Sequence, residues 1–170
     1  MKLIKQKITP FLWFDDNAEE AVKFYVSIFK KSKIKAITYY GEAGPGTKGS
    51  VMTVTFEIEG QQFMALNGGS QYKFNESVSF MVHCETQAEV DRYWKKLTAG
   101  GKEVACGWLK DKYGLFWQIV PTVFLELISS KDKVKSQRAM EAMMNMVKLD
   151  IRKLKQAYNG KTAKNRTKKV

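Results

Sequence analysis

The stretch from Ile8 to Phe29, ITPFLWFDDNAEEAVKFYVSIF, joins a short apolar run to an amphipathic segment through a polar break. The apolar run at 8–14 has the composition of a β-strand, and the segment at 18–29 spaces its apolar residues as a helix does. Asn17 is followed three residues later by Glu20, which is the capping-box pattern of a helix start. The stretch therefore predicts a strand that leads directly into a helix.

A weaker copy of this stretch returns at 77–101, SVSFMVHCETQAEVDRYWKKLTAGG. A shift of 69 residues places Asn17 on Thr86, and Thr86 is also followed three residues later by an acidic residue, Glu89. The same shift places Phe14 on His83. A repeat of this length indicates two copies of one supersecondary unit.

The residues after each helix complete the two copies. Alternating or β-branched runs follow each helix, and glycine-rich loops such as GEAGPGTKG (41–49) separate them. The expected elements of the first copy are strands at 8–14, 33–40, 51–58 and 62–66 with a helix at 18–29. The expected elements of the second copy are strands at 78–84, 102–106, 107–110 and 115–120 with a helix at 87–99. The predicted fold class is therefore α+β, with two βαβββ modules at about 6–67 and 77–121 inside a domain of residues 1–122.

The C-terminal part differs in charge from the rest of the chain. Residues 1–130 hold 16 Lys and Arg against 14 Asp and Glu, whereas residues 131–170 hold 13 against 3. Apolar residues at helical spacing predict helices at about 132–147 and 151–158, within a helical appendage at 123–160. The basic segment 161–170 has a single large apolar residue and is expected to be disordered.

Several classes of protein are excluded by composition. No apolar run approaches the ~20 residues that span a bilayer, and no secretory signal is recognisable at the start. Cys84 and Cys106 lack the spacing of a metal motif and do not form a disulfide framework. We therefore expect a cytoplasmic protein with reduced cysteines and no contact with a membrane.

The two-module pattern resembles the vicinal oxygen chelate superfamily, which includes glyoxalase I, bleomycin-resistance proteins and extradiol dioxygenases. The resemblance covers about residues 6–121. The opening stretch, FMALNGG (63–69), CGWLKDKYGLFWQIVP (106–121) and MEAMM (140–144) look more specifically like the PhnB-like subfamily, which carries the label 3-demethylubiquinone-9 3-methyltransferase. This resemblance implies a glyoxalase-like open barrel built from the two modules, and a homodimer.

The label implies methyl transfer, but the residues do not predict it. A site for S-adenosylmethionine usually needs a glycine-rich turn between a strand and a helix. The glycine-rich loop at 41–49 is followed by VMTVTFEI, which alternates as a strand. The residues therefore predict no cofactor site, and they leave open whether the protein is an enzyme.

The resemblance also implies positions for a metal ion. Superfamily members that use a metal hold it with four side chains, and these positions fall on Pro10, Ala65, Ser79 and Gln118 in this sequence. None offers an imidazole or a carboxylate, so we expect no catalytic metal. The alternative is a lyase, dioxygenase or transferase that binds a divalent metal through other ligands.

What the resemblance leaves is a ligand cavity. Because side chains alternate along strands, the residues that share a face with the four inherited positions are expected to line it. A small, partly apolar ligand suits their composition. The predicted lining is Leu12, Phe14, Phe63, Ala65, Asn67, Ser79, Met81, Phe116 and Gln118, with Trp108 and Tyr113 near a turn. The competing interpretation is that these side chains simply fill the barrel.

The remaining residues on these strands have other expected roles. Phe11, Trp13, Val82 and Trp117 are expected to face the helices as core. His83 is the only histidine and the weak candidate for a general base; alternatively it is a hydrogen-bonded or solvated residue at a strand end.

The methionine-rich C-terminal helices are expected to dock either on a second subunit or on their own barrel. The basic tail could bind nucleic acid through phosphates, but it lacks interleaved aromatic residues, and a solvated tail is favoured. We therefore expect a homodimer that binds a small molecule, and no nucleic-acid partner.

Overall fold

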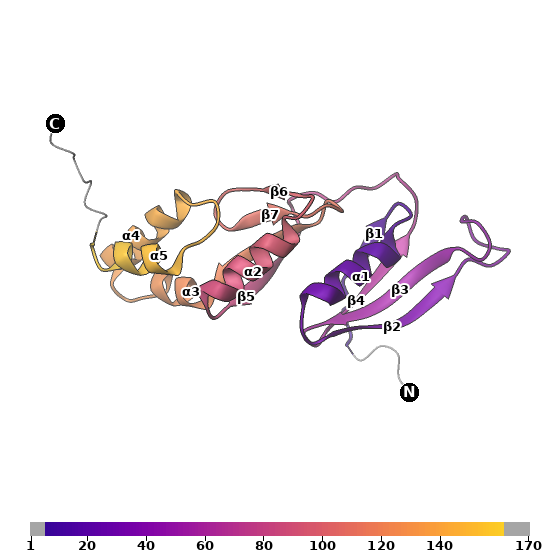
Figure 1. Ribbon diagram of the computed structural model, residues 1–170, viewed down its shortest axis with the longest axis horizontal. Coiled ribbons are helices and arrows are strands. Elements are labelled where there is room, and N and C mark those ends of the chain that lie inside the picture. Colours follow the sequence, from indigo (N-terminus) through magenta and orange to yellow (C-terminus); the bar gives the residue numbers. More distant parts are fainter. Residues whose placement is uncertain (1–5, 162–170) are drawn as a thin grey trace. The chain divides into compact units, whose positions relative to one another are not determined.

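The computed structural model describes residues 6–161, and the chain divides into two compact units, the first ending at Phe74 and the second beginning at Asn75 (Figure 1). The second unit holds the C-terminal helices as well as the second β module, so these helices do not form a separate body. Residues 162–170, which include nearly all of the predicted disordered tail, lie outside the described residues. Within 6–161, no helix is long and apolar enough to cross a membrane.

Unit 1 is a four-stranded sheet with one helix. Its elements are β1 Phe11–Phe14, α1 Ala18–Ile28, β2 Ser32–Tyr39, β3 Val51–Ile58 and β4 Gln61–Asn67. The strand order is β1-β4-β3-β2, with β1 parallel to β4 and the other pairs antiparallel. This is the predicted βαβββ module, although β1 begins at Phe11 rather than at Ile8.

Unit 2 repeats this arrangement and adds three helices. Its elements are β5 Ser79–Cys84, α2 Gln87–Leu97, β6 Lys102–Glu103, β7 Trp108–Lys110, β8 Phe116–Pro121, α3 Thr122–Ile128, α4 Lys133–Met144 and α5 Ile151–Tyr158. The strand order β5-β8-β7-β6 matches that of unit 1, with β5 parallel to β8. The predicted α+β class and the duplicated module are therefore confirmed. Strand β6 is shorter than expected because the backbone turns at Cys106 and Gly107, which both have positive φ.

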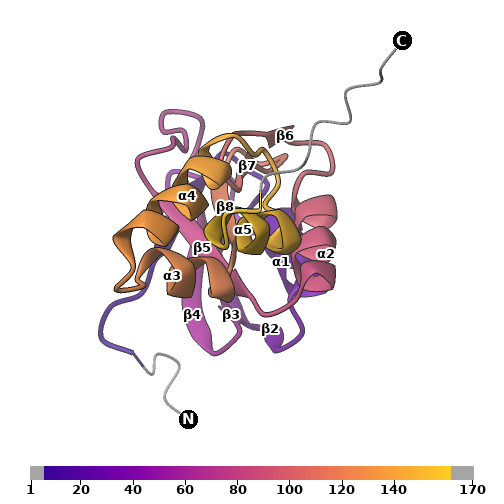
Figure 2. The same ribbon diagram turned by 90° about the vertical axis from the view of Figure 1, so that its left-hand side faces the viewer.

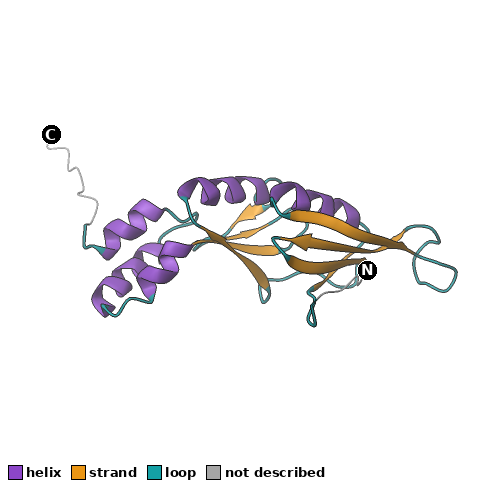
Figure 3. Cartoon of the chain, turned by 90° about the horizontal axis from the view of Figure 1, so that it is seen from below, coloured by secondary structure: helices purple, strands orange, loops and turns teal. Residues whose placement is uncertain are grey.

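Each module packs its helix on one face of its own sheet (Figure 3). In unit 1 the fully buried residues of α1 (Ala18, Ala21, Val22, Tyr25 and Ile28) meet the buried strand residues Leu12, Phe14, Val54, Phe56, Phe63 and Ala65. Strand pairing places this strand set on one face, because Leu12 lies opposite Ala65, Val54 opposite Ala65, and Phe56 opposite Phe63. In unit 2 the equivalent set under α2 is Val82, Cys84, Leu109, Trp117 and Ile119.

The two modules differ by one residue in the turn between the first strand and the helix. Asp15, Asp16 and Asn17 separate β1 from α1, whereas only Glu85 and Thr86 separate β5 from α2. Side chains alternate between the two faces of a strand. One extra residue in the turn therefore places the opposite set of strand side chains beneath the helix. Phe14 is consequently 3% exposed under α1, while His83, its match in the repeat, is exposed on the opposite face of its sheet.

This exchange corrects the predicted orientation of β1. Phe11 was expected to face the helix as core, but its side chain is 54% exposed, and Trp13 shares its face. The expected orientations of Val82 and Trp117 toward the helix agree with the structure.

The two helix N-termini are also capped differently. The Thr86 side chain accepts from the N–H of Glu89 as predicted, and the Glu89 carboxylate accepts from the N–H of Glu85 at 2.8 Å. Asn17 was expected to cap α1, but its side chain makes no capping hydrogen bond. Instead Asn67 at the end of β4 accepts from the N–H of Ala18 at 2.8 Å and donates to the Val51 carbonyl at 3.0 Å.

The C-terminal helices belong to unit 2, where α3 contacts β8 and α4 and α5 pack against α3 and each other at the end of the unit (Figures 1 and 2). Val120, Phe124, Leu149 and Leu154 form their core, with Met140, Met143 and Met146 against it. Backbone N–H groups of Cys106 and Gly107 donate to the carbonyls of Met146 and Val147. The methionine-rich stretch therefore serves mainly as internal packing, with Met144 alone among its four methionines more than half exposed.

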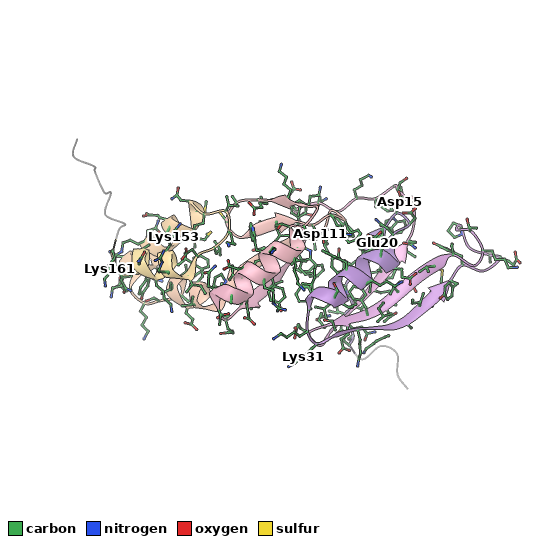
Figure 4. All side chains as sticks on the ribbon, viewed as in Figure 1. Asp15, Glu20, Lys31, Asp111, Lys153 and Lys161 are labelled. Atoms are coloured by element: carbon green, nitrogen blue, oxygen red, sulfur yellow. The ribbon has the colours of Figure 1, made fainter. Side chains whose placement is uncertain are left out.

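The β7–β8 turn is built around Asp111, a buried carboxylate that Figure 4 labels. One carboxylate oxygen accepts from the N–H groups of Tyr113 and Leu115, and the other accepts from the indole N–H of Trp117 at 2.9 Å. Charge-assisted hydrogen bonds of this kind compensate for burying the charge.

Replacing Asn67 with Ala should destabilise the protein by about 1–2 kcal/mol, because the first turn of α1 loses its cap and the Val51 carbonyl loses a donor. Asn17→Ala is the matched control and should change the unfolding free energy by less than about 0.5 kcal/mol. Urea denaturation measures both. A larger loss from Asn17→Ala than from Asn67→Ala would contradict the capping assignment.

Asp111→Ala should cost about 2–4 kcal/mol, because three N–H donors in and beside the turn lose their acceptor. Glu126→Ala, at an exposed position in α3, is the control and should be nearly neutral. Thermal denaturation followed by circular dichroism measures the stability of both variants. Equal melting temperatures for the two variants would show that Asp111 does not support the turn.

Candidate functional site

The face of the β5–β8 sheet opposite α2 carries most of the predicted site residues in unit 2. Strand pairing arranges them in rows, since Ser79 lies opposite Phe116, and Met81 opposite Gln118. Strand β7 extends the rows, with Trp108 opposite Gln118 and Lys110 opposite Phe116. We call the side chains of Ser79, Met81, Trp108, Lys110, Phe116 and Gln118 the open face.

Three of the six open-face side chains, Met81, Trp108 and Phe116, are apolar or aromatic, and the face remains accessible within unit 2. Met81 is 43% exposed, and Trp108, Phe116 and Gln118 are half-buried. The C-terminal helices pack against Val120, which follows Gln118 on the same face of β8 and lies outside the open face. A face of this composition is available to an apolar ligand or partner.

One polar pair lies on the open face. The Gln118 side-chain amide donates to the Ser79 hydroxyl oxygen at 2.9 Å. The hydroxyl hydrogen of Ser79 and the amide oxygen of Gln118 can then serve as one donor and one acceptor. Two of the four inherited metal positions are therefore joined by a neutral hydrogen bond.

His83 lies beyond this pair, opposite Val120 on the same face. Its side chain is exposed and makes no hydrogen bond or ion pair with any other residue in 6–161. A general base is normally oriented by a second group. The solvated alternative that the sequence left open describes this geometry better.

The predicted site residues of unit 1 do not share an accessible sheet face as those of unit 2 do. Leu12, Phe14, Phe63 and Ala65 are at most 6% exposed and belong to the core beneath α1. Asn67 caps α1. The residues on the uncovered face of β1 are instead Phe11 and Trp13, and the indole N–H of Trp13 donates to the Gly69 carbonyl at 2.8 Å. The turns at 15–17 and 85–86 differ by one residue, but the sequence alone did not establish which turn length buries which face of its strand.

Tyr113 and Pro10 are the remaining predicted positions, and each contacts neighbouring residues. Tyr113 sits in the β7–β8 turn, where the Lys112 ammonium lies 4.8 Å from its ring centroid. Pro10 precedes β1, and its carbonyl accepts from the Met64 N–H. Ala65 is fully buried. Across residues 6–161, no three His, Cys, Asp or Glu side chains gather closely enough to hold a metal ion.

The glycine-rich loop at 41–49 does not fit a nucleotide cofactor. It joins the antiparallel strands β2 and β3, so no helix N-terminus follows it to bind a phosphate or carboxylate group. Gly44 and Gly46 lie against the ring of Tyr40, where a Cβ atom would overlap it. The glycines therefore pack over a buried tyrosine, whose hydroxyl donates to the Asn67 carbonyl.

Two hollows lie away from the open face. One of about 680 Å³ in unit 2 lies between the start of α2 and α5, and includes Glu85, Arg152 and Lys155. The other, about 440 Å³ in unit 1, lies beside Asp15, Tyr40 and Asn67. Asn67 is the only predicted lining residue that borders either of these two hollows.

The two cysteines are in contrasting environments. Cys84 is fully buried beneath α2, and this desolvation, together with the nearby Glu89 carboxylate, raises the pKa of its thiol to about 12. Cys106 is partly exposed, with its sulfur 3.9 Å from that of Met144. Both are free thiols.

Comparison with known proteins identifies similar chains. The model of the family described as 3-demethylubiquinone-9 3-methyltransferase matches residues 6–120. A PhnB protein structure from Bacillus cereus is 40% identical, covers 69% of this chain and 100% of its own, and has a TM-score of 0.64. A Pseudomonas aeruginosa protein structure is 20% identical, covers 69% of this chain and 98% of its own, and has a TM-score of 0.58.

The fosfomycin resistance protein FosX from Listeria monocytogenes, solved with Mn(II) and sulfate, is a more distant match. It is 16% identical, covers 67% of this chain and 87% of its own, and has a TM-score of 0.46. Among curated proteins, no sequence matches this chain.

At pH 8, a thiol reagent such as 5,5′-dithiobis(2-nitrobenzoate) should label the folded protein rapidly at one position only. Cys106 is accessible, whereas the Cys84 thiol is buried and stays protonated far below its pKa of about 12. Cys106→Ser should abolish the rapid phase and Cys84→Ala should leave it intact. Two equally fast thiols in the wild-type protein would contradict the packing of Cys84 under α2.

Proposed function

Because the chain belongs to the 3-demethylubiquinone-9 3-methyltransferase (PhnB) family, we propose that it binds a small, partly apolar molecule without a catalytic metal, and that the open face of unit 2 is the binding surface. The observation that carries this proposal is the Ser79–Gln118 hydrogen bond beside the accessible apolar side chains of the same sheet face. Ligand sites of this kind combine apolar contact area with a few polar groups that orient the ligand.

The open face supplies both components. Met81, Trp108 and Phe116 offer apolar and aromatic surface, and the Ser79–Gln118 pair offers one donor and one acceptor side by side. The ligand would lie against the aromatic side chains and exchange hydrogen bonds with the pair. Burial of the ligand's apolar atoms would supply most of the affinity.

Absence of a catalytic metal is proposed from ligand chemistry. The inherited positions hold Pro10, Ala65, Ser79 and Gln118, and the last two offer only a neutral hydroxyl and amide. First-row transition metals favour imidazole, thiolate and carboxylate groups. The divalent-metal enzyme remains the second candidate, through ligands other than these four.

We further propose that the protein acts as a cytoplasmic homodimer, as its family resemblance implied. Two features support this: the free thiols Cys84 and Cys106, and the exposed aromatic side chain of Phe11 in unit 1. Nucleic acid is not part of this proposal. Sedimentation velocity measures the oligomeric state. A monomer at micromolar concentration would contradict the proposed dimer.

Binding to the open face can be tested with the neutral fluorescent probe N-phenyl-1-naphthylamine. Met81→Glu places a carboxylate among the apolar side chains at an exposed position that should tolerate it, and should raise the probe's Kd at least about tenfold, or 1.4 kcal/mol. Val134→Glu, at a 67% exposed position on α4, is the control and should leave the Kd unchanged. Equal probe binding by wild type and Met81→Glu would overturn the proposed site.

Elemental analysis of protein purified without chelator should find less than stoichiometric Mn, Fe, Co, Ni, Cu and Zn. The physical reason is the neutral chemistry of Ser79 and Gln118 at the inherited positions. One bound ion per chain, lost on treatment with a chelator together with any enzymatic activity, would instead establish the divalent-metal enzyme.

A further inference from the structure

A row of four side chains crosses the whole sheet of unit 2. Lys102 on β6 lies opposite Lys110 on β7, Lys110 lies opposite Phe116 on β8, and Phe116 lies opposite Ser79 on β5. Residues that pair directly across strands project from the same face of a sheet. The open face therefore has a basic end, formed by Lys102 and Lys110 beside its aromatic and polar residues.

The two lysines form an unfavourable pair on their own. Like charges directly opposite one another destabilise a sheet, and neither lysine makes an ion pair with a described residue. The adjacent acidic residue, Glu103, alternates to the other face, where its carboxylate accepts from the indole N–H of Trp94 on α2. Asp111, the next residue after Lys110, is buried and already accepts from three N–H groups.

The position of Lys110 directs its charge toward the aromatic surface. Its ammonium lies 5.6 Å from the ring centroid of Phe116, its neighbour in the row. An aromatic ligand resting on Phe116 would thus have a cation at its edge, with the Ser79–Gln118 pair on the other side. Lys102, one strand further out, can contribute a second ammonium to the same oxyanion.

From this row we infer that the ligand of the open face carries an oxyanion, and that Lys102 and Lys110 select for it. The ligand class is a small aromatic or apolar acid, with its ring over Phe116 and Trp108 and its anionic group between the two ammonium groups. This inference rests on the proposed function, since it assigns the ligand class of the same face. An anion between the lysines would also relieve their mutual repulsion.

Two fluorescent probes with the same ring system separate charge from apolar contact. They are 8-anilino-1-naphthalenesulfonate, which is anionic, and N-phenyl-1-naphthylamine, which lacks the sulfonate. The double variant Lys102→Gln/Lys110→Gln should weaken sulfonate binding on the order of tenfold and leave neutral-probe binding within twofold. The matched control, Lys131→Gln with Lys133→Gln at two exposed lysines at the start of α4, removes the same net charge and should change the binding of neither probe.

Salt supplies a second readout. Raising NaCl from 50 to 500 mM should weaken sulfonate binding more in the wild type than in the double variant, because salt screens the lysine charges. A double variant that binds both probes like the wild type overturns the inference, and so does one that loses both probes equally, since that loss is not specific to charge.

Met81→Glu distinguishes failure of this inference from failure of the proposed function. If Met81→Glu weakens both probes while the lysine variants change neither, the open face binds ligands without selecting an anion. If Met81→Glu changes the binding of neither probe, the open face is not the binding surface, and the inferred ligand class is contradicted as well.

Discussion

A β-strand can bury only every second side chain beneath a helix, and this two-residue period decides which residues of the protein are core and which remain accessible. In unit 2, Val82 and Cys84 lie under α2, so Ser79 and Met81 are left on the opposite face. In unit 1 the turn between strand and helix is one residue longer, and the buried set includes Leu12 and Phe14. The length of that turn therefore controls the chemistry of each uncovered face.

Polar side chains hold these layers in register. Asn67 ties β4 to the start of α1 and to β3, and Asp111 gathers the N–H groups of the β7–β8 turn with the indole of Trp117. Each satisfies groups that would otherwise be costly to bury. In unit 2 the C-terminal helices add a further core around Leu149 and Leu154, which supports the sheet at Val120, outside the open face.

The role that we propose for the open face is ligand recognition rather than the methyl transfer in the family's description. Its Ser79–Gln118 pair is neutral, its cations are on β6 and β7, and His83 has no orienting partner among residues 6–161. The glycine-rich loop packs over Tyr40 and leads into a strand. These features are the basis of our proposal that the protein selects a ligand by shape, hydrogen bonding and charge.

By itself, the sequence determined the α+β class, the duplicated module, most element boundaries and the faces of β5 and β8, because these depend on local periodicity and on caps such as Thr86. Only the tertiary structure decided which face of β1 meets α1, that Asn67 caps this helix in place of Asn17, and that Lys102, Lys110, Phe116 and Ser79 share one row. The physical reason is that a one-residue change in a turn reverses a strand, and that strand register brings together residues whose separation in sequence carries no signal.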